Sequence, residues 1–297
     1  MAGASSFSGL VDKTFWMILG SSVLMLLGVT VTMVYFIVKY RRSRHPQATD
    51  IEGSATLEAL WTILPTILVM VMFYYGWAGF KVMRTTPAGA TPVTVQARMW
   101  SWSFKYENGK QSTELYVPVG RPVAVKLESA DVIHSFFVPA FRLKEDCVPG
   151  RNNHAWFQAE REGVYDILCA EYCGDQHSTM LGKLVAVPAD TFDVWLERGG
   201  GRPTGLKLLQ LKGCVACHTS DGSKLVGPSF KGIYGHPVRV TTNGVEREVV
   251  VDDEYIRQSL VKPKADVVVG YQPVMPEMGS QLDEEDIRLI IDYIKRQ

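Results

Sequence analysis

Two long uncharged apolar runs near the start of the chain constrain its fold more than any other feature. No residue is charged in the segments 14–38 and 59–80. Each run exceeds the ~20 residues that a helix needs to cross the hydrocarbon core of a bilayer. The first run is too long for the apolar part of a signal peptide, so we expect a retained anchor. The two runs predict a transmembrane α-helical hairpin within residues 1–90, and a buried hairpin of a soluble protein is the alternative.

A cluster of basic residues sets the orientation of this hairpin. Lys39, Arg41, Arg42 and Arg44 directly follow the first run, and the positive-inside rule places such a loop in the cytoplasm. Everything after about residue 82 is then extracytoplasmic. The whole chain carries 31 basic and 31 acidic residues, so no net charge attracts nucleic acid, and membrane lipid is the expected environment.

Glu58 lies at the cytoplasmic start of the second run, with Pro65 further into it. An acidic residue in the first turn of a helix complements the positive end of the helix dipole. Ionisable groups at the edge of a spanning helix also serve proton pathways. The position alone leaves both interpretations open.

The pattern changes after residue 91 to short stretches rich in β-branched residues. Examples are 92–97, 121–127 and 182–187, which are separated by Gly, Pro and Asn turns. These stretches predict a small antiparallel β-barrel or sandwich in a domain over residues 91–198.

One segment of this domain carries metal-ligating side chains. Cys169, Cys173, His177 and Met180 recur every three or four residues, and His134 lies upstream. Two thiolates, two imidazoles and a thioether form a soft set that suits copper, whereas zinc would need no methionine. A mononuclear blue-copper site uses a single cysteine. The second thiolate therefore indicates that both sulfurs bridge two metal ions.

The same segment carries a family resemblance. The run C-A-E-Y-C-G-D-Q-H-S-T-M at 169–180, with H-S-F-F-V-P at 134–139 and K-E-D-C-V-P-G-R at 144–151, closely resembles subunit II of the haem–copper oxidases. The resemblance covers residues 14–190 and implies a cupredoxin-like domain that holds the dinuclear CuA centre.

The resemblance implies a role for each matching residue of the loop. Cys169 and Cys173 would bridge the coppers, His134 and His177 would each bind one, and Met180 would be a weak ligand. Glu171 would contribute its backbone carbonyl to copper. Its carboxylate would face the partner subunit and bind Mg²⁺ there, a cation that prefers oxygen ligands.

Two tryptophans lie in the run M-W-S-W-S-F-K-Y at 99–106. Trp100 and Trp102 are two residues apart, so on one strand they would share a face, and core packing is the usual meaning of such a pair. The resemblance implies that Trp100 is the point of electron entry.

Other matches concern the partner subunit and the membrane. The run L-E-A-L-W-T-I-L-P at 57–65 resembles the second span of the family, and Glu58 would open a proton channel there. Asp146 and Arg151 would border the partner near the magnesium. Cys147 departs from the family, which usually carries Ala, and we expect it to be a small buried hydrophobe.

A third domain is expected after a Gly-rich linker at 199–203. Cys214, Cys217 and His218 form the C-x-x-C-H motif of c-type haem attachment, in which two thiols bind the haem and the histidine binds iron. A redox C-x-x-C or a zinc knuckle is the alternative. Met275, directly before Pro276, supplies a candidate second iron ligand.

Residues 204–297 resemble an all-α class I cytochrome c of the type fused to subunit II in bacterial oxidases. In that family the carbonyl of the residue matching Pro228 accepts a hydrogen bond from the ligand histidine, which fixes its ring. Asn243 and Gly244 indicate a β-hairpin. A late helix is predicted with one apolar stripe of Ile287, Ile290, Ile291 and Ile294.

Together these features predict the electron-input subunit of a respiratory cytochrome c oxidase in a bacterial cytoplasmic membrane. An external donor, either a cytochrome or a quinol-oxidising complex, would reduce haem c. Electrons would pass through CuA to the haem-bearing subunit I, which reduces O₂ with proton translocation, and subunit III is a further expected partner.

The rival functions are the electron-input subunit of a nitric oxide reductase and a non-catalytic membrane-anchored shuttle or copper sensor. Glu58, as a proton inlet, favours the oxidase. A covalent haem beside a copper loop favours electron conduction over reversible copper sensing.

Overall fold

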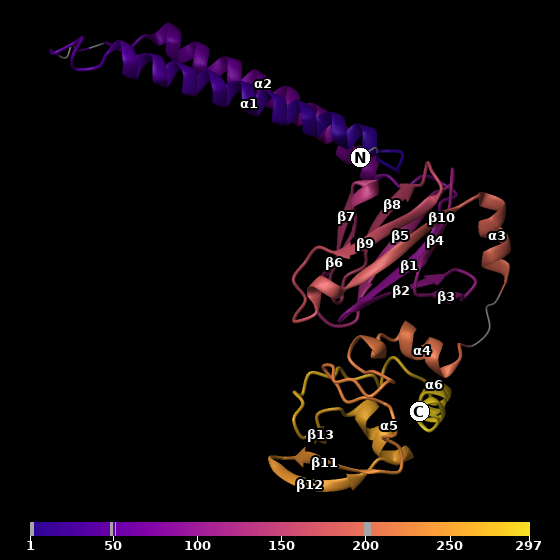
Figure 1. Ribbon diagram of the computed structural model, residues 1–297. Coiled ribbons are helices and arrows are strands. Elements are labelled where there is room, and N and C mark those ends of the chain that lie inside the picture. Colours follow the sequence, from indigo (N-terminus) through magenta and orange to yellow (C-terminus); the bar gives the residue numbers. More distant parts are fainter. Residues whose placement is uncertain (1–2, 48–49, 51, 199–202) are drawn as a thin grey trace.

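The computed structural model describes residues 3–47, 50, 52–198 and 203–297. Along the chain lie a helical hairpin, a β-sandwich and a C-terminal part that mixes helices and strands (Figure 1). The linker predicted at 199–203 falls outside the described residues except for Pro203.

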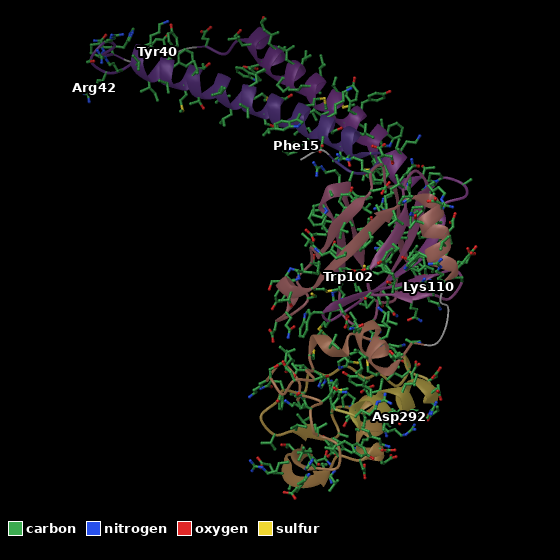
Figure 2. The ribbon with its side chains drawn as sticks, turned by 45° about the vertical axis from the view of Figure 1, so that its right-hand side comes forward. Phe15, Tyr40, Arg42, Trp102, Lys110 and Asp292 are labelled. Carbon is green, nitrogen blue, oxygen red and sulfur yellow. The ribbon has the colours of Figure 1, made fainter. Side chains whose placement is uncertain are left out.

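The hairpin consists of α1 (Ser8–Lys39) and α2 (Ala55–Arg84), and it confirms the two predicted helices. Both are long and apolar enough to cross a membrane. Their large apolar side chains point outward, so that Leu24 is 73% exposed. Figure 2 shows Tyr40 and Arg42 at the end of the hairpin far from the sandwich. Such a surface is stable in lipid and costly in water.

The other end of the hairpin is attached to the sandwich. Phe7 is buried, with its ring 5.0 Å from that of Trp156. Arg142 Nε donates to Asp12 Oδ1 at 2.7 Å, and Arg84 pairs with Glu145 at 2.9 Å. These contacts fix the base of the anchor on the domain that follows it.

Two five-stranded sheets form the sandwich, in the orders β3-β2-β1-β5-β8 and β4-β10-β9-β6-β7. The strands are β1 (Thr91–Arg98), β2 (Ser101–Tyr106), β3 (Gln111–Ser112), β4 (Leu115–Pro118), β5 (Pro122–Ser129), β6 (His134–Val138), β7 (Leu143–Cys147), β8 (Asn153–Gln158), β9 (Gly163–Cys169) and β10 (Leu181–Val187). The short helices η1 (Pro139–Phe141) and η2 (His177–Thr179) lie between strands, and α3 (Ala189–Glu197) follows β10.

The two separate sheets confirm the sandwich, which was one of the two predicted forms, and they exclude the closed barrel. The pairing is not purely antiparallel, because β1 pairs with β5 in parallel, as β4 does with β10. Parallel neighbours arise only where the chain crosses over before it returns. Strands β2, β3 and β4 lie between β1 and β5 in the sequence, so no short turn reveals this pairing.

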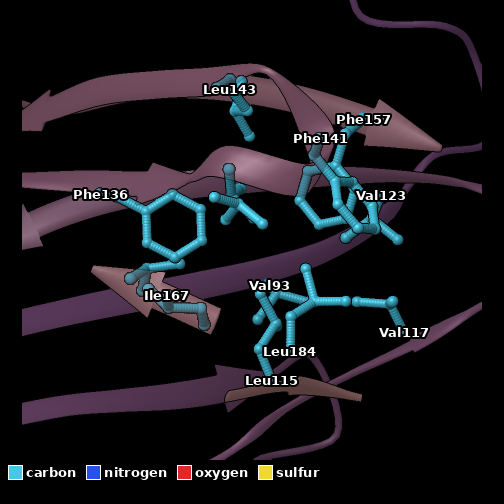
Figure 3. Close-up of a cluster of buried hydrophobic side chains, with 14 of the residues drawn as sticks. Val93, Leu115, Val117, Val123, Phe136, Phe141, Leu143, Phe157, Ile167 and Leu184 are labelled. Carbon is cyan, nitrogen blue, oxygen red and sulfur yellow. The ribbon is translucent and has the colours of Figure 1, made fainter. Parts of the chain in front are cut away.

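The core lies between the two sheets. Along β1 the alternate residues Val93, Val95 and Ala97 are buried, as expected for a strand with one face inward. Figure 3 shows Val93 and Val123 of one sheet close to Leu184 and Phe141, which come from the other sheet and its connections. This packed interior gives the loops at the ends of the sandwich a rigid support.

The C-terminal part contains three α-helices, a short 3-10 helix and a three-stranded sheet, so the all-α prediction was wrong. The elements are α4 (Gly205–Leu211), η3 (Cys214–Ala216), β11 (Pro237–Thr242), β12 (Val245–Val250), α5 (Asp253–Val261), β13 (Val267–Val268) and α6 (Glu284–Ile294). The sheet order is β12-β11-β13.

The hairpin predicted at Asn243 and Gly244 is confirmed. These residues have φ values of 50° and 83°, which suit the tight turn between β11 and β12. Flanking valines and threonines favour strands, which is the physical reason that a sheet forms in this part.

The predicted isoleucine stripe is also confirmed. All four isoleucines of α6 are buried, and Asp283 caps the helix through the backbone N–H of Asp286. They pack with Leu208 and Leu209 of α4 in a separate core of the C-terminal part.

Candidate metal and haem sites

Strand pairing assembles the candidate copper site. His134 opens β6, and Cys169 ends β9. These strands are antiparallel neighbours, with Phe136 opposite Cys169. The loop after β9 then carries Cys173, His177 and Met180 back over the same end of the sandwich before β10 begins.

The candidate ligand atoms lie in a continuous chain of short distances. Cys169 Sγ is 3.8 Å from Cys173 Sγ and 3.9 Å from His134 Nδ1. Cys173 Sγ is 3.5 Å from His177 Nδ1 and 3.8 Å from Met180 Sδ. Ligand atoms of His134, Cys169 and Cys173 all lie within 4.8 Å of one another. This arrangement of soft donors suits copper ions that share both sulfurs.

The backbone carbonyl and the side-chain carboxylate of Glu171 lie in different surroundings. Its backbone carbonyl lies 3.2 Å from Cys169 Sγ, so that this oxygen faces the sulfur cluster. The residue itself is exposed, as is the adjacent Tyr172 at 74%. The carboxylate is therefore accessible to a partner subunit.

Asp131 is a candidate site residue that was not singled out from the sequence. Its Oδ1 lies 2.8 Å from His134 Nε2, and its Oδ2 accepts from Met99 N at 2.7 Å. Burial opposes protonation of His134, but the hydrogen bonds with Asp131 and Cys169 raise its pKa. Such a carboxylate orients a metal-binding imidazole, with Nδ1 left for the metal. The spacing Asp-x-x-His was the available signal.

The two loop cysteines differ in acidity. Burial opposes ionisation of both thiols, yet the contact with His134 and two backbone hydrogen bonds lower the pKa of Cys169. Burial and the neighbouring Cys169 raise the pKa of Cys173. The contacts of Cys169 with His134 and the backbone therefore favour its thiolate, and a thiolate is the form that binds metal.

The two tryptophans do not share a strand face as predicted. Trp100 lies in the turn between β1 and β2, where its indole N–H donates to Cys173 O at 3.0 Å. Trp102 lies in β2 and is buried, with its ring edge-on to His134 and Phe136. The turn at residues 99–100 breaks the alternation on which the prediction relied.

The C-x-x-C-H motif lies on η3 and the residues that follow it. His218 Nδ1 donates to Pro228 O at 2.7 Å, which is the expected contact, and this bond leaves the ring's Nε2 to a metal. Phe230 stacks on His218 at 4.8 Å. A Cβ at Gly227 would lie 2.5 Å from the His218 ring, so only glycine permits this close approach.

Burial keeps both motif thiols protonated. It raises the pKa of Cys214 to about 11 and that of Cys217 to about 11. Burial also lowers the pKa of His218, against the hydrogen bond to Pro228. A neutral imidazole is the form that binds iron, so the chemistry of the three residues fits a haem.

The two candidate methionines have different surroundings. Met275 is half-buried and packs on the same apolar cluster as Cys214 and Phe230. Met278 is 3% exposed, and its Sδ lies 3.7 Å from Arg98 Nη1. The Met278 side chain is therefore buried in contact with Arg98 of the sandwich.

Glu58 is not brought near the copper site. It lies in the first turn of α2, whose capping residue Ser54 accepts from Leu57 N. This end of α2 is remote from the sandwich (Figure 1). Glu58 therefore lies at the end of the hairpin that is far from the copper site.

Cys147 has the small buried position that was expected. It pairs with His134 in the register of β6 and β7 and is 0% exposed. Burial raises the pKa of Cys147 to about 12, which keeps it a thiol.

Sequence comparisons relate the hairpin and the sandwich to a known family. Residues 2–77 match the family model of the cytochrome c oxidase subunit II transmembrane domain, and residues 110–187 match that of the periplasmic domain. A cytochrome c oxidase subunit 2 from Alkalihalophilus pseudofirmus is 31% identical and covers 94% of this chain and 85% of its own. One from Synechocystis is 28% identical, over 68% of this chain and 76% of its own. The crystal structure of the periplasmic domain of subunit II of Bradyrhizobium japonicum cytochrome oxidase is 32% identical and covers 38% of this chain and 95% of its own, with a TM-score of 0.36.

Proposed function

Because this chain belongs to the cytochrome c oxidase subunit II family, we propose that it passes electrons from an external donor through a covalent haem c and a dinuclear CuA centre. Membership makes it an electron-input subunit of an oxidoreductase complex that also contains a catalytic subunit. The chain is anchored in a membrane with its copper domain outside the cytoplasm, and the family's periplasmic domain implies CuA-type copper binding.

The main observation in support of the proposal is that the candidate ligand atoms of the copper loop lie close together. Cys169 and Cys173 would bridge the coppers, and His134 and His177 would each bind one through Nδ1. Met180 Sδ and the Glu171 carbonyl would complete the set. Bound there, the copper pair supplies one-electron redox chemistry. The rigid sheet ends and the Asp131 contact would hold its ligands in place during transfer.

The C-terminal part would hold haem c within residues 204–297. Cys214 and Cys217 would attach it, and His218 and Met275 would bind its iron. Support comes from the His218–Pro228 bond, from the glycine at 227 and from the shared packing of Cys214 and Met275. The alignment with the Alkalihalophilus pseudofirmus relative spans 94% of the chain, so it extends into this part.

Further roles complete the proposal. The exposed Glu171 carboxylate would bind Mg²⁺ at the boundary with subunit I, and Trp100 would conduct electrons to the copper loop. Glu58 would admit protons for translocation at the cytoplasmic surface. The complex would lie in a bacterial cytoplasmic membrane with subunit III, and its donor would be a cytochrome or a quinol-oxidising complex.

Affinity purification from the native membrane tests the proposal. The tagged chain should leave the membrane with a multi-span partner that carries haem, and it should contain copper and covalently bound haem iron. A chain that emerges alone with zinc in place of copper would contradict the assignment.

A further inference from the structure

The turn between β1 and β2 connects three parts of the molecule. Arg98, Met99 and Trp100 are consecutive, and each bonds to a different partner. Arg98 reaches the C-terminal part, Met99 N donates to Asp131, which holds His134, and Trp100 Nε1 donates to Cys173 O. The turn therefore joins the candidate haem-bearing part to the candidate copper loop.

Arg98 is a buried cation at this junction. It is 4% exposed. Its Nη1 donates to Lys212 O at 2.9 Å and lies 3.7 Å from Met278 Sδ, while its Nη2 donates to Gln281 Oε1. Lys212 follows α4 directly, where helix carbonyls lack partners of their own and attract positive charge. A planar guanidinium satisfies several acceptors at once in a way that an ammonium cannot.

The residue next to the haem motif touches the same turn. A Cβ at Gly213 would lie 2.4 Å from Ser101 Oγ and 2.9 Å from the Arg98 Cδ atom. Gly213 also has φ of 76°, which favours glycine. Since Cys214 follows at once, its backbone is held directly against the turn. Figure 1 shows α4 on the side of the C-terminal part that faces the sandwich.

We propose that Arg98 is a positioning residue that docks the C-terminal part on the sandwich and so holds the Cys214 edge of the haem beside Trp100. This inference rests on the proposed function, because it needs both cofactors. When bound, the haem would give up one electron and the copper centre would accept it, so the transfer would balance without a further reactant. Arg98 itself is not oxidised or reduced.

The contact has a consequence for the external donor. The tethered part occupies the approach to the β1–β2 turn. The donor then reduces the haem from a face that is turned away from the sandwich, and Trp100 receives electrons from within the chain.

Flash-induced electron transfer in the full-length, detergent-solubilised protein tests the inference. A photoreductant reduces the haem, and the reoxidation of the haem by the copper centre is followed optically. Arg98→Gln should slow this step by on the order of tenfold to a hundredfold, the cost of a small misplacement. Arg98→Lys should restore it only in part. Haem absorption and the copper electron-spin signal should stay unchanged.

Two further variants complete the design. Ser101→Leu keeps Arg98 but adds bulk where Gly213 packs, and it should also slow transfer. Arg239→Gln is the matched control, because Arg239 is an exposed arginine of the C-terminal hairpin that pairs with Glu246 at 3.5 Å. It should transfer electrons at the wild-type rate. Hydrogen exchange of the α4 and η3 amides should become faster in Arg98→Gln and in Ser101→Leu, and it should stay unchanged in Arg239→Gln.

The outcomes separate this inference from the proposed function. A wild-type chain without covalent haem or without a copper signal would contradict both. A wild-type chain with both cofactors, together with wild-type transfer rates in Arg98→Gln and Ser101→Leu, would overturn the docking role alone. Slower transfer without faster exchange in α4 and η3 would also overturn it.

Discussion

Cys169 is the single residue on which the copper assignment depends most directly. Its sulfur contacts Cys173, His134 and the Glu171 carbonyl at once. A thiolate can bridge two soft metal ions, whereas a hydroxyl of the same shape cannot.

Replacing Cys169 by Ser should therefore abolish the dinuclear centre. Haem c should remain attached, since Cys214 packs against the separate core of the C-terminal part. The measurement is the electron-spin signal of mixed-valence copper in the purified variant, with haem absorption as the control. Persistence of the copper signal would refute the bridging role.

The choice of iron ligand also belongs to the residue scale. Pro276 restricts Met275 to extended geometry, which presents its side chain across the loop, while Met278 is engaged near Arg98. Met275→Leu should keep the covalent haem, lose the sulfur-to-iron absorption band and lower the haem potential, since a Met ligand raises it. Met278→Leu is the matched control. Loss of the band in that control and its survival in Met275→Leu would show that Met278 is the ligand.

At the scale of elements, the start of α2 and the C-terminal hairpin make separate contributions. Glu58 lies in the capped first turn of α2. This position suits both an interaction with the helix dipole and a role in proton uptake, and the turnover rate distinguishes the two roles.

Asp266 joins β11, β12 and α5 through Thr242, Arg247 and Gln258.

Glu58→Gln should slow turnover of the complex while copper and haem contents stay near wild type. The amide keeps the shape of the side chain but cannot carry a proton. Oxygen consumption of the purified complex measures the effect. Turnover at the wild-type rate would favour the dipole interpretation.

Asp266 should make the C-terminal part sensitive to acid. Burial opposes its ionisation, but hydrogen bonds from Thr242, Arg247 and Gln258 lower its pKa below the ordinary value of 3.8. A lowered pKa stabilises the fold above that value, and the contribution disappears as the pH falls through the folded-state pKa.

Asp266→Asn should therefore destabilise this part by about 1–3 kcal/mol at neutral pH, and the difference from wild type should shrink in acid. Thermal unfolding followed by haem absorption measures it. Glu246→Gln, which removes an exposed carboxylate of the same hairpin, should have little effect. A difference that persists unchanged below pH 3.8 would contradict the argument.

At the scale of the whole molecule, sequence patterns among adjacent residues predicted more of the structure than patterns among residues far apart in the chain. The apolar runs predicted both helices of the anchor, and Asn243 with Gly244 predicted a hairpin, because each signal lies in adjacent residues. The parallel pairing of β1 with β5 and the docking contacts of Arg98 depend on residues far apart in the chain. Trp100 was placed on a strand because alternation does not reveal a turn that interrupts it.

The candidate sites follow the same rule. The copper loop and the haem motif were recognised from short spacings, and the structure brings the loop residues within a few ångströms of one another. Asp131 was missed because a carboxylate beside a histidine has many ordinary explanations until its hydrogen bond is seen.

The order in which the cofactors are reduced is the strictest test of the electron-transfer role of this chain. The purified complex of this chain with its catalytic subunit should be mixed anaerobically with a reductant, and its cofactors followed by stopped-flow absorption. We expect haem c to be reduced first, the copper centre second and the haem of the catalytic subunit last. Reduction of that last haem while the copper centre stays oxidised would show that electrons bypass this chain.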